Sequence, residues 1–154
     1  MAGTLARESL ASRHLHSDMV PDWDLLTDAD CNVLFEGSRH ATELLVALLL
    51  PCLTGPIAWR RASEPLKLAP ACRTLIVEEV GTLCADEQAT LRDWLEHRDE
   101  RMQVVSTHEE ALLPLVTHGL FDERLYYRLN VLLVHVGNGA VHPPAVPHAT
   151  SSVR

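Results

Sequence analysis

Arg73-Thr-Leu-Ile-Val-Glu-Glu-Val80, followed by Gly81, is the stretch of sequence that decides the fold. Its apolar residues are largely β-branched and form a continuous run, which predicts a strand buried on both faces. Such a strand needs a helical layer on each side. Residues 86–97 provide one candidate, because Leu91, Trp94 and Leu95 fall on one side of an amphipathic helix.

Strands and helices alternate along the middle of the chain. Beside the strand at 74–80, we expect strands near residues 31–36, 56–60, 102–107 and 131–136. Further helices are expected at 41–50, 108–118 and 121–129, with Pro114 bending the helix at 108–118 or marking its start. This alternation implies a mostly parallel five-stranded sheet between two layers of helices, a three-layer α/β fold.

The composition of the two ends differs from that of the middle. Residues 1–30 read as an N-terminal extension, helical around Leu5, Leu10 and Leu15 and then acidic and turn-rich after Pro21. Residues 137–154 are rich in Gly, Pro, His and Ser and are expected to form a flexible tail. The α/β core is therefore expected at 31–136.

Composition and charge restrict the function. The chain has 154 residues, is 47% hydrophobic and carries a formal charge of −8, which suits one domain with a hydrophobic core. The negative charge argues against non-specific binding to nucleic acid or to an anionic membrane. The longest apolar run, at 44–50, is too short to span a bilayer, and no signal peptide is recognisable, so we expect a cytoplasmic protein.

The cysteines form no CxxC pair. Cys31, Cys52, Cys72 and Cys84 are expected to be buried reduced thiols, with a zinc site or a disulfide set as the alternative. Lys67 is the only lysine in the chain, which excludes lysine chemistry at any other position.

Two segments carry a resemblance to a known family. Phe121-Asp-Glu-Arg-Leu-Tyr-Tyr-Arg-Leu-Asn-Val131 resembles the arginine-finger segment of the sigma-54-dependent transcription activators, which are AAA+ ATPases, and the match is unbroken over the seven residues 125–131. Residues 74–83, with Gln88, Leu91 and Leu95, resemble the Walker B strand of that family and the helix after it.

Other segments follow in the order of the family. Residues 103–107 take the place of its sensor strand, and residues 32–37 and 43–47 flank the place of its Walker A loop. The resemblance covers about residues 30–136. It implies a P-loop NTPase-like fold, the AAA+ large subdomain, with strand order 5-1-4-3-2.

The Walker A loop departs most from the pattern of the family. Gly37 is followed by Ser38-Arg-His-Ala-Thr42, which is one residue short and lacks the internal glycines and the lysine. Those glycines let backbone N–H groups curl around phosphates, and the lysine adds a point charge. Arg39 is a candidate substitute with a different geometry and position. Thr42 is expected to cap the helix, or alternatively to contact magnesium.

Other departures fall on residues that matter for catalysis. Glu79 matches the Walker B residue that polarises the attacking water, whereas Glu78 replaces the magnesium-holding Asp with a side chain about one bond longer. The alternative is that both carboxylates end a strand in solvent. Asp122 replaces the first finger arginine and would repel phosphate. Arg128 matches the second finger arginine, either as a vestigial finger or as a structural residue bonding a carboxylate or a helix carbonyl.

Further parts of the family pattern are altered or not recognisable. The sensor asparagine aligns with about His108. The sigma-contacting GAFTGA loop, the helical lid and the DNA-binding helix-turn-helix are not found in the sequence.

The resemblance and these departures together predict a catalytically impaired module for protein interaction or regulation in transcription. Its partner would be an intact AAA+ activator or a second copy, with no direct nucleic-acid contact. Glu79 and Arg128 would be vestigial catalytic residues, and Gly37, Arg39, Thr42 and Glu78 a vestigial nucleotide site. We expect no metal site, no cofactor and no ATP hydrolysis. The alternatives are a weak ATP- or ADP-binding protein that uses magnesium, an active ATPase, which is the least favoured, and a decayed reading frame.

Overall fold

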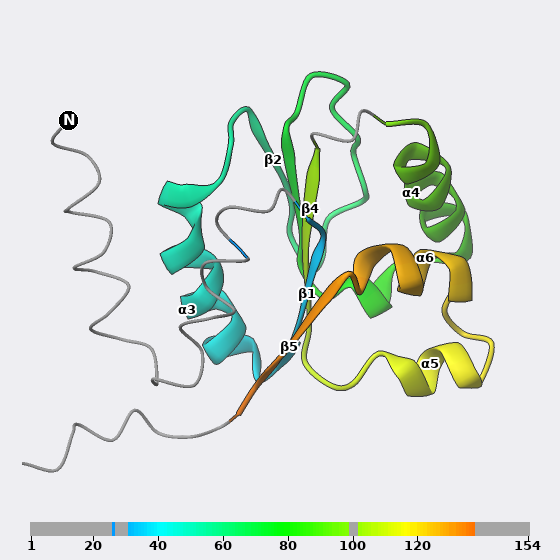
Figure 1. Cartoon of the computed structure of the whole chain (residues 1–154). Coiled ribbons are helices and arrows are strands. Elements are labelled where there is room, and N and C mark those ends of the chain that lie inside the picture. The colour runs from blue at the N-terminus through cyan, green and yellow to red at the C-terminus, as the bar shows by residue number, and fades with distance from the viewer. Residues whose placement is uncertain (1–25, 27–30, 99–101, 138–154) are drawn as a thin grey trace, which may run out of the picture.

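Five parallel strands form the centre of the molecule (Figure 1). The structure is a computed structural model that describes residues 26, 31–98 and 102–137. The strands are β1 Val33–Gly37, β2 Ile57–Arg60, β3 Thr74–Val77, β4 Gln103–His108 and β5 Leu132–Val136. Their order is β2-β3-β4-β1-β5, and every neighbouring pair is parallel. The predicted sheet and its order are confirmed.

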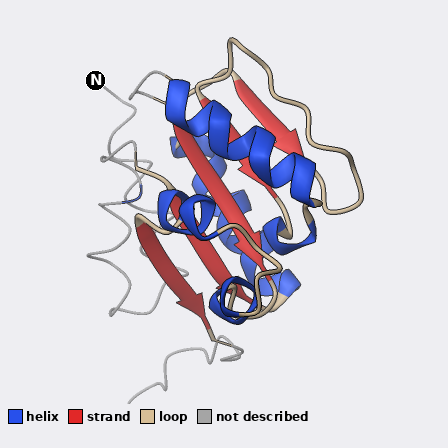
Figure 2. Cartoon of the chain, turned by 90° about the vertical axis from the view of Figure 1, so that its right-hand side faces the viewer, coloured by secondary structure: helices blue, strands red, loops and turns tan. Residues whose placement is uncertain are grey.

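Helices cover both faces of this sheet. Helix α3, Arg39–Leu49, lies on one face, and a short 3-10 turn, Leu50–Cys52, follows it. Figure 2 looks onto the other face, which is covered by α4 Ala85–His97, α5 Leu113–Thr117 and α6 Glu123–Leu129. The predicted three-layer α/β architecture is therefore confirmed.

Alternation along the strands divides the buried side chains between two cores. Phe35, Ile76 and Val105 point toward α3, where they pack with Leu45, Leu49 and the N-terminal Leu26. Their neighbours Leu34, Leu75, Val77 and Val104 point the other way and pack with Leu91, Leu95, Leu125 and Leu129 of α4 and α6. Both faces of the three central strands, β1, β3 and β4, are buried, as the continuous apolar runs predict.

Two predicted elements differ from the structure in more than their end residues. The strand expected at 74–80 ends at Val77, because the chain turns at Glu78 and Glu79 into a 3-10 turn, Val80–Thr82. The helix expected at 108–118 begins only at Leu113, and His108 belongs to β4. Pro114 stands in the first turn of that helix, where its fixed φ and missing N–H are tolerated.

The cysteine prediction holds only in part. None of the four cysteines forms a disulfide, but Cys72 alone is buried, whereas Cys31 and Cys52 are partly buried and Cys84 is exposed. Within the described ranges, no three His, Cys, Asp or Glu side chains gather in a way that could hold a metal ion. Nor does that part of the chain contain a helix long and apolar enough to cross a membrane. The predicted helix at 1–20 and the tail beyond residue 137 lie outside the described residues.

Candidate functional site

The carboxyl ends of β1, β3 and β4 meet at one edge of the sheet. In open parallel sheets, ligands bind in the crevice outside these ends. The residues of this chain at that edge are Gly37 after β1, Glu78 and Glu79 after β3, and His108 at the end of β4. Arg39 opens helix α3 directly after β1, so its charge also lies at this edge.

The connection between β1 and α3 is very short. Only Ser38 separates Gly37 from the helix. Gly37 has φ +157°, and a Cβ there would lie 2.3 Å from the carbonyl oxygen of Val136, so the close approach of β5 requires glycine. Thr42 is not the N-cap, and the capping prediction is wrong. The helix starts earlier, with Ser38 as N-cap, and the buried Thr42 hydroxyl donates to the carbonyl of Arg39 at 3.0 Å.

Glu79 is buried and held from the side of β4. Its backbone has φ 47°, a left-handed conformation that is unusual for a residue with a side chain. Its Oε2 accepts the Glu109 N–H at 3.2 Å and lies 3.2 Å from His108 Nδ1. Burial alone would raise the pKa of Glu79, but His108, the Glu109 amide and the charge of Arg39 together hold it below its ordinary value. The alternative of a carboxylate in open solvent is wrong for this residue.

His108 occupies the place that the resemblance assigns to the sensor asparagine. Among the described residues, the one polar contact of its buried Nδ1 is with Glu79 Oε2, at 3.2 Å. The ring lies against the backbone of Gly81, where a Cβ would come within 2.5 Å of the ring Cε1 and 2.9 Å of Leu115 Cδ1. The glycine after the Walker B-like strand therefore makes room for this histidine.

Glu78 faces away from the crevice, toward the edge strand β2. Its Oε1 accepts from Trp59 Nε1 and from Arg61, both at 2.8 Å, and its Oε2 accepts from the Ala62 N–H at 3.3 Å. The guanidinium of Arg61 also stacks on the Trp59 ring, 3.9 Å from its centroid. Both oxygens of the carboxylate are thus used to hold the end of β2 and the loop after it. The alternative of a solvent-exposed strand end is wrong for Glu78 as well.

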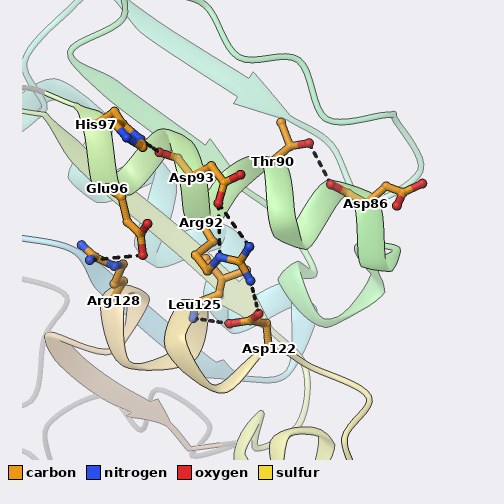
Figure 3. A network of polar contacts seen from close by, with 9 residues as sticks. All are labelled: Asp86, Thr90, Arg92, Asp93, Glu96, His97, Asp122, Leu125 and Arg128. Atoms are coloured by element: carbon orange, nitrogen blue, oxygen red, sulfur yellow. Dashed lines mark hydrogen bonds and ion pairs between the residues drawn. The ribbon is translucent and has the colours of Figure 1, made fainter.

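The finger-like segment forms structural contacts on the face covered by α4 and α6 (Figure 3). Asp122 is the N-cap of α6, accepting the Leu125 N–H at 2.8 Å, and its other oxygen pairs with Arg92 of α4 at 2.6 Å. Burial would raise the pKa of Asp122, but the Leu125 amide and Arg92 outweigh it and lower that pKa. Arg128 lies 3.5 Å from Glu96, so its contact with a carboxylate agrees with the structural alternative.

Sequence reasoning did not assign a role to three buried polar residues. Gln88 donates to the carbonyls of Leu83 and Leu120 and accepts the Asp122 N–H, which ties α4 to the start of α6. Asn32 likewise joins the backbone of residue 128 to that of residue 104, and Glu36 accepts the N–H of residue 112 at 2.8 Å. A polar residue inside an otherwise apolar run is the signal that could have identified Asn32 and Glu36. Gln88 follows two acidic residues in the sequence, so no such signal marks it.

Comparisons with known proteins agree with this architecture. The profile of a family described as the Sigma-54 interaction domain matches residues 10–138. A search of curated proteins finds no match.

Solved structures show the same fold at low sequence identity. NtrX from Brucella abortus in complex with ADP superposes with a TM-score of 0.64 at 16% identity, covering 86% of this chain and 38% of that one. The P-loop NTPase domain of the sigma-54 transport activator from E. coli gives a TM-score of 0.52 at 14% identity, covering 71% of this chain and 98% of that one. Thermotoga maritima RuvB, as the T158V variant, gives a TM-score of 0.62 at 15% identity, covering 82% of this chain and 46% of that one. The chain therefore spans about two fifths of the length of NtrX.

Proposed function

Because the chain belongs to the Sigma-54 interaction domain family, we propose that it is a member that does not hydrolyse ATP and acts as a protein-interaction or regulatory module in transcription. The observation that carries this proposal is the position of Glu78. The carboxylate that would hold magnesium accepts instead from Trp59, Arg61 and the Ala62 N–H. Magnesium needs freely placed oxygen ligands in octahedral geometry, which a carboxylate with both oxygens engaged does not offer.

Two further features support loss of the chemistry. Phosphoryl transfer relies on positioning the phosphates and on positive charge around them. The turn after Gly37 contains a single residue before the helix, so few backbone N–H groups can converge on a phosphate. At the place of the first finger arginine, Asp122 caps α6 and pairs with Arg92, a role that serves the fold and not a neighbouring nucleotide.

The fold itself is retained, and that supports a role in binding proteins. The described core keeps the sheet and a buried polar bridge through Gln88 that positions α6. We propose a protein partner, either an intact AAA+ activator or a second copy of the chain. The formal charge of −8 argues against direct contact with nucleic acid or an anionic membrane, and we keep the cytoplasm as the proposed location.

Weak nucleotide binding is the second candidate. It is favoured by NtrX, which has been solved with ADP and with ATP, and by the charge of Arg39 at the start of α3. In this alternative Gly37, Arg39 and Thr42 would line a vestigial nucleotide site, with Glu78 and Glu79 beside it. The buried Thr42 hydroxyl, which already donates within the helix, and the carboxylates at the same edge both work against tight binding.

Phosphate release from magnesium-ATP tests the proposal. The wild-type chain should release phosphate no faster than the Glu79→Ala variant, at any protein concentration that can be reached. Glu110→Ala, at an exposed position, is the matched control for changing a carboxylate near this edge. Steady hydrolysis by wild type and Glu110→Ala that disappears in Glu79→Ala would refute the proposed loss of catalysis.

A further inference from the structure

A groove opens between the start of α4 and the turn that joins α5 to α6. Its volume is about 430 Å³, within the size range of ligand-binding clefts. Leu83, Ala85, Ala89 and Leu120 supply apolar walls, and Arg92 and Asp122 close one side. The groove lies on the face of the sheet opposite α3, away from the Walker A-like turn at the start of α3.

The polar groups of this groove are already paired with one another. Gln88 has three hydrogen bonds, to the backbones of Leu83, Leu120 and Asp122. Arg92 is held by Asp122 at 2.6 Å and by Asp93 at 3.2 Å. A small polar ligand would therefore find few free partners. The groove offers apolar surface instead, including Leu120, which is 66% exposed.

The two chain segments that line the groove are acidic. Residues 83–93 and 119–124 together contain five carboxylates and two arginines, a net charge of −3. Asp86 and Glu87 stand in the first turn of α4, and Asp122 and Glu123 stand at the start of α6, so acidic residues begin the helix of each segment. Complementary charge on a partner must be positive. A second copy of this chain, with a charge of −8, is a poor match.

We propose that this groove is the docking site for a partner-protein segment in which a large apolar side chain is flanked by Arg or Lys. The apolar side chain enters between Ala89 and Leu120, and the basic side chains face Asp86 and Glu123 of the two lining segments. This inference rests on the proposed role as a protein-interaction module, and it adds the surface and the chemistry of the partner.

Amide shifts of the 15N-labelled full-length chain test the inference with three synthetic peptides. The probe is acetyl-Arg-Leu-Leu-Arg-amide, and the comparisons are acetyl-Glu-Leu-Leu-Glu-amide and acetyl-Arg-Ser-Ser-Arg-amide. Only the first should shift the amides of residues 83–89 and 119–123. Raising sodium chloride from about 50 mM to about 300 mM should lower the affinity for the probe peptide about threefold, because exposed charges are screened.

Variants separate the groove from the rest of the surface. Ala89→Arg fills the groove and adds positive charge, so it should lower the affinity for the probe peptide at least about tenfold. The double change Asp86→Asn with Glu123→Gln should lower the affinity for the probe peptide about threefold. Ala47→Arg, at an exposed position of α3 on the other side of the sheet, is the matched control and should leave binding unchanged.

Three results would overturn the inference: no shift with the basic-apolar probe, equal binding of the acidic-apolar peptide, or shifts centred outside the groove. Phosphate release is measured separately. A failed peptide titration with no ATP hydrolysis would reject this docking site and leave the loss of catalysis intact. Hydrolysis abolished by Glu79→Ala would reject the proposed function whatever the peptides do.

Discussion

Replacement of Glu78 by alanine tests whether this carboxylate holds the fold together. In the wild type it accepts three hydrogen bonds, from Trp59 Nε1, Arg61 and the Ala62 N–H, and the side chain is only 15% exposed. Losing the acceptor leaves the partly buried indole and amide donors without a partner, at about 1 kcal/mol or more each. The Arg61 pair adds little, since that side chain is 55% exposed.

We therefore expect Glu78→Ala to lower the free energy of unfolding by about 2–3 kcal/mol. For a domain of this size the melting temperature should fall by roughly 4 °C per kcal/mol. The assay is urea unfolding followed by tryptophan fluorescence together with circular dichroism. Glu78→Gln keeps one oxygen acceptor for the indole, so its loss in the free energy of unfolding should be about half that of Glu78→Ala.

A carboxylate whose role is to bind magnesium leads to the opposite expectation for the stability of the alanine variant. Such a residue stands among other acidic groups without a metal, so its removal would be neutral or stabilising. If Glu78→Ala unfolds at the same urea concentration as wild type, or at a higher one, the structural role assigned to Glu78 is wrong. Glu110→Ala, at an exposed position, should stay within about 0.5 kcal/mol of wild type and controls for the loss of a surface charge.

Three other predictions concern residues around the site. Gly81→Ala should destabilise the fold by about 1–3 kcal/mol, because its Cβ would lie 2.5 Å from the His108 ring; an unchanged melting temperature would contradict the packing described. Asp122→Ala should cost about 1–2 kcal/mol in urea unfolding through loss of the α6 cap, whereas Asp122→Asn should keep most of the stability; equal losses would speak against capping. Folding lowers the pKa of Glu79, so its ionised form stabilises the fold at pH values above the ordinary pKa of 4.5, and this contribution is lost as the pH falls further. The difference in the free energy of unfolding between wild type and Glu79→Gln should therefore narrow between about pH 7 and about pH 3.5. A difference that widens would contradict the lowered pKa.

The core of the fold could be predicted from the sequence because its signals are local. The apolar run that contains β3 requires burial on both faces, and the leucines at helical spacing in α4 supply one of the covering layers. The order of the strands came from the resemblance, through the finger-like match at 125–131. Asp122 is a further local signal, because it is an N-cap residue directly before α6.

The roles of the acidic pair could not be predicted, because they depend on contacts between distant segments. Glu78 and Glu79 are adjacent and chemically identical, yet one faces Trp59 of β2 and the other faces His108 of β4. The turn at Glu79, with φ 47°, sends the two side chains to different neighbours. Nothing within the run 73–80 distinguishes these directions.

The expected cap at Thr42 failed for a related reason. The resemblance places this residue near the start of the helix, but the shortened loop lets α3 begin directly after Ser38. Thr42 then lies inside the first turn, buried, with its hydroxyl bonded to the carbonyl of Arg39. A deletion in a loop moves the helix start, and only the structure shows by how much.

Calorimetric titration of the chain with magnesium-ATP tests the central claim most directly. A single-residue turn after Gly37, an engaged Glu78 and the carboxylates at the same edge predict a dissociation constant no better than about 1 mM, roughly 4 kcal/mol of binding. Heat of binding that fits a micromolar constant would contradict the claim that the nucleotide site is lost. Loss of that affinity in Arg39→Ala, but not in the exposed control Arg124→Ala, would then assign the phosphate contact to Arg39.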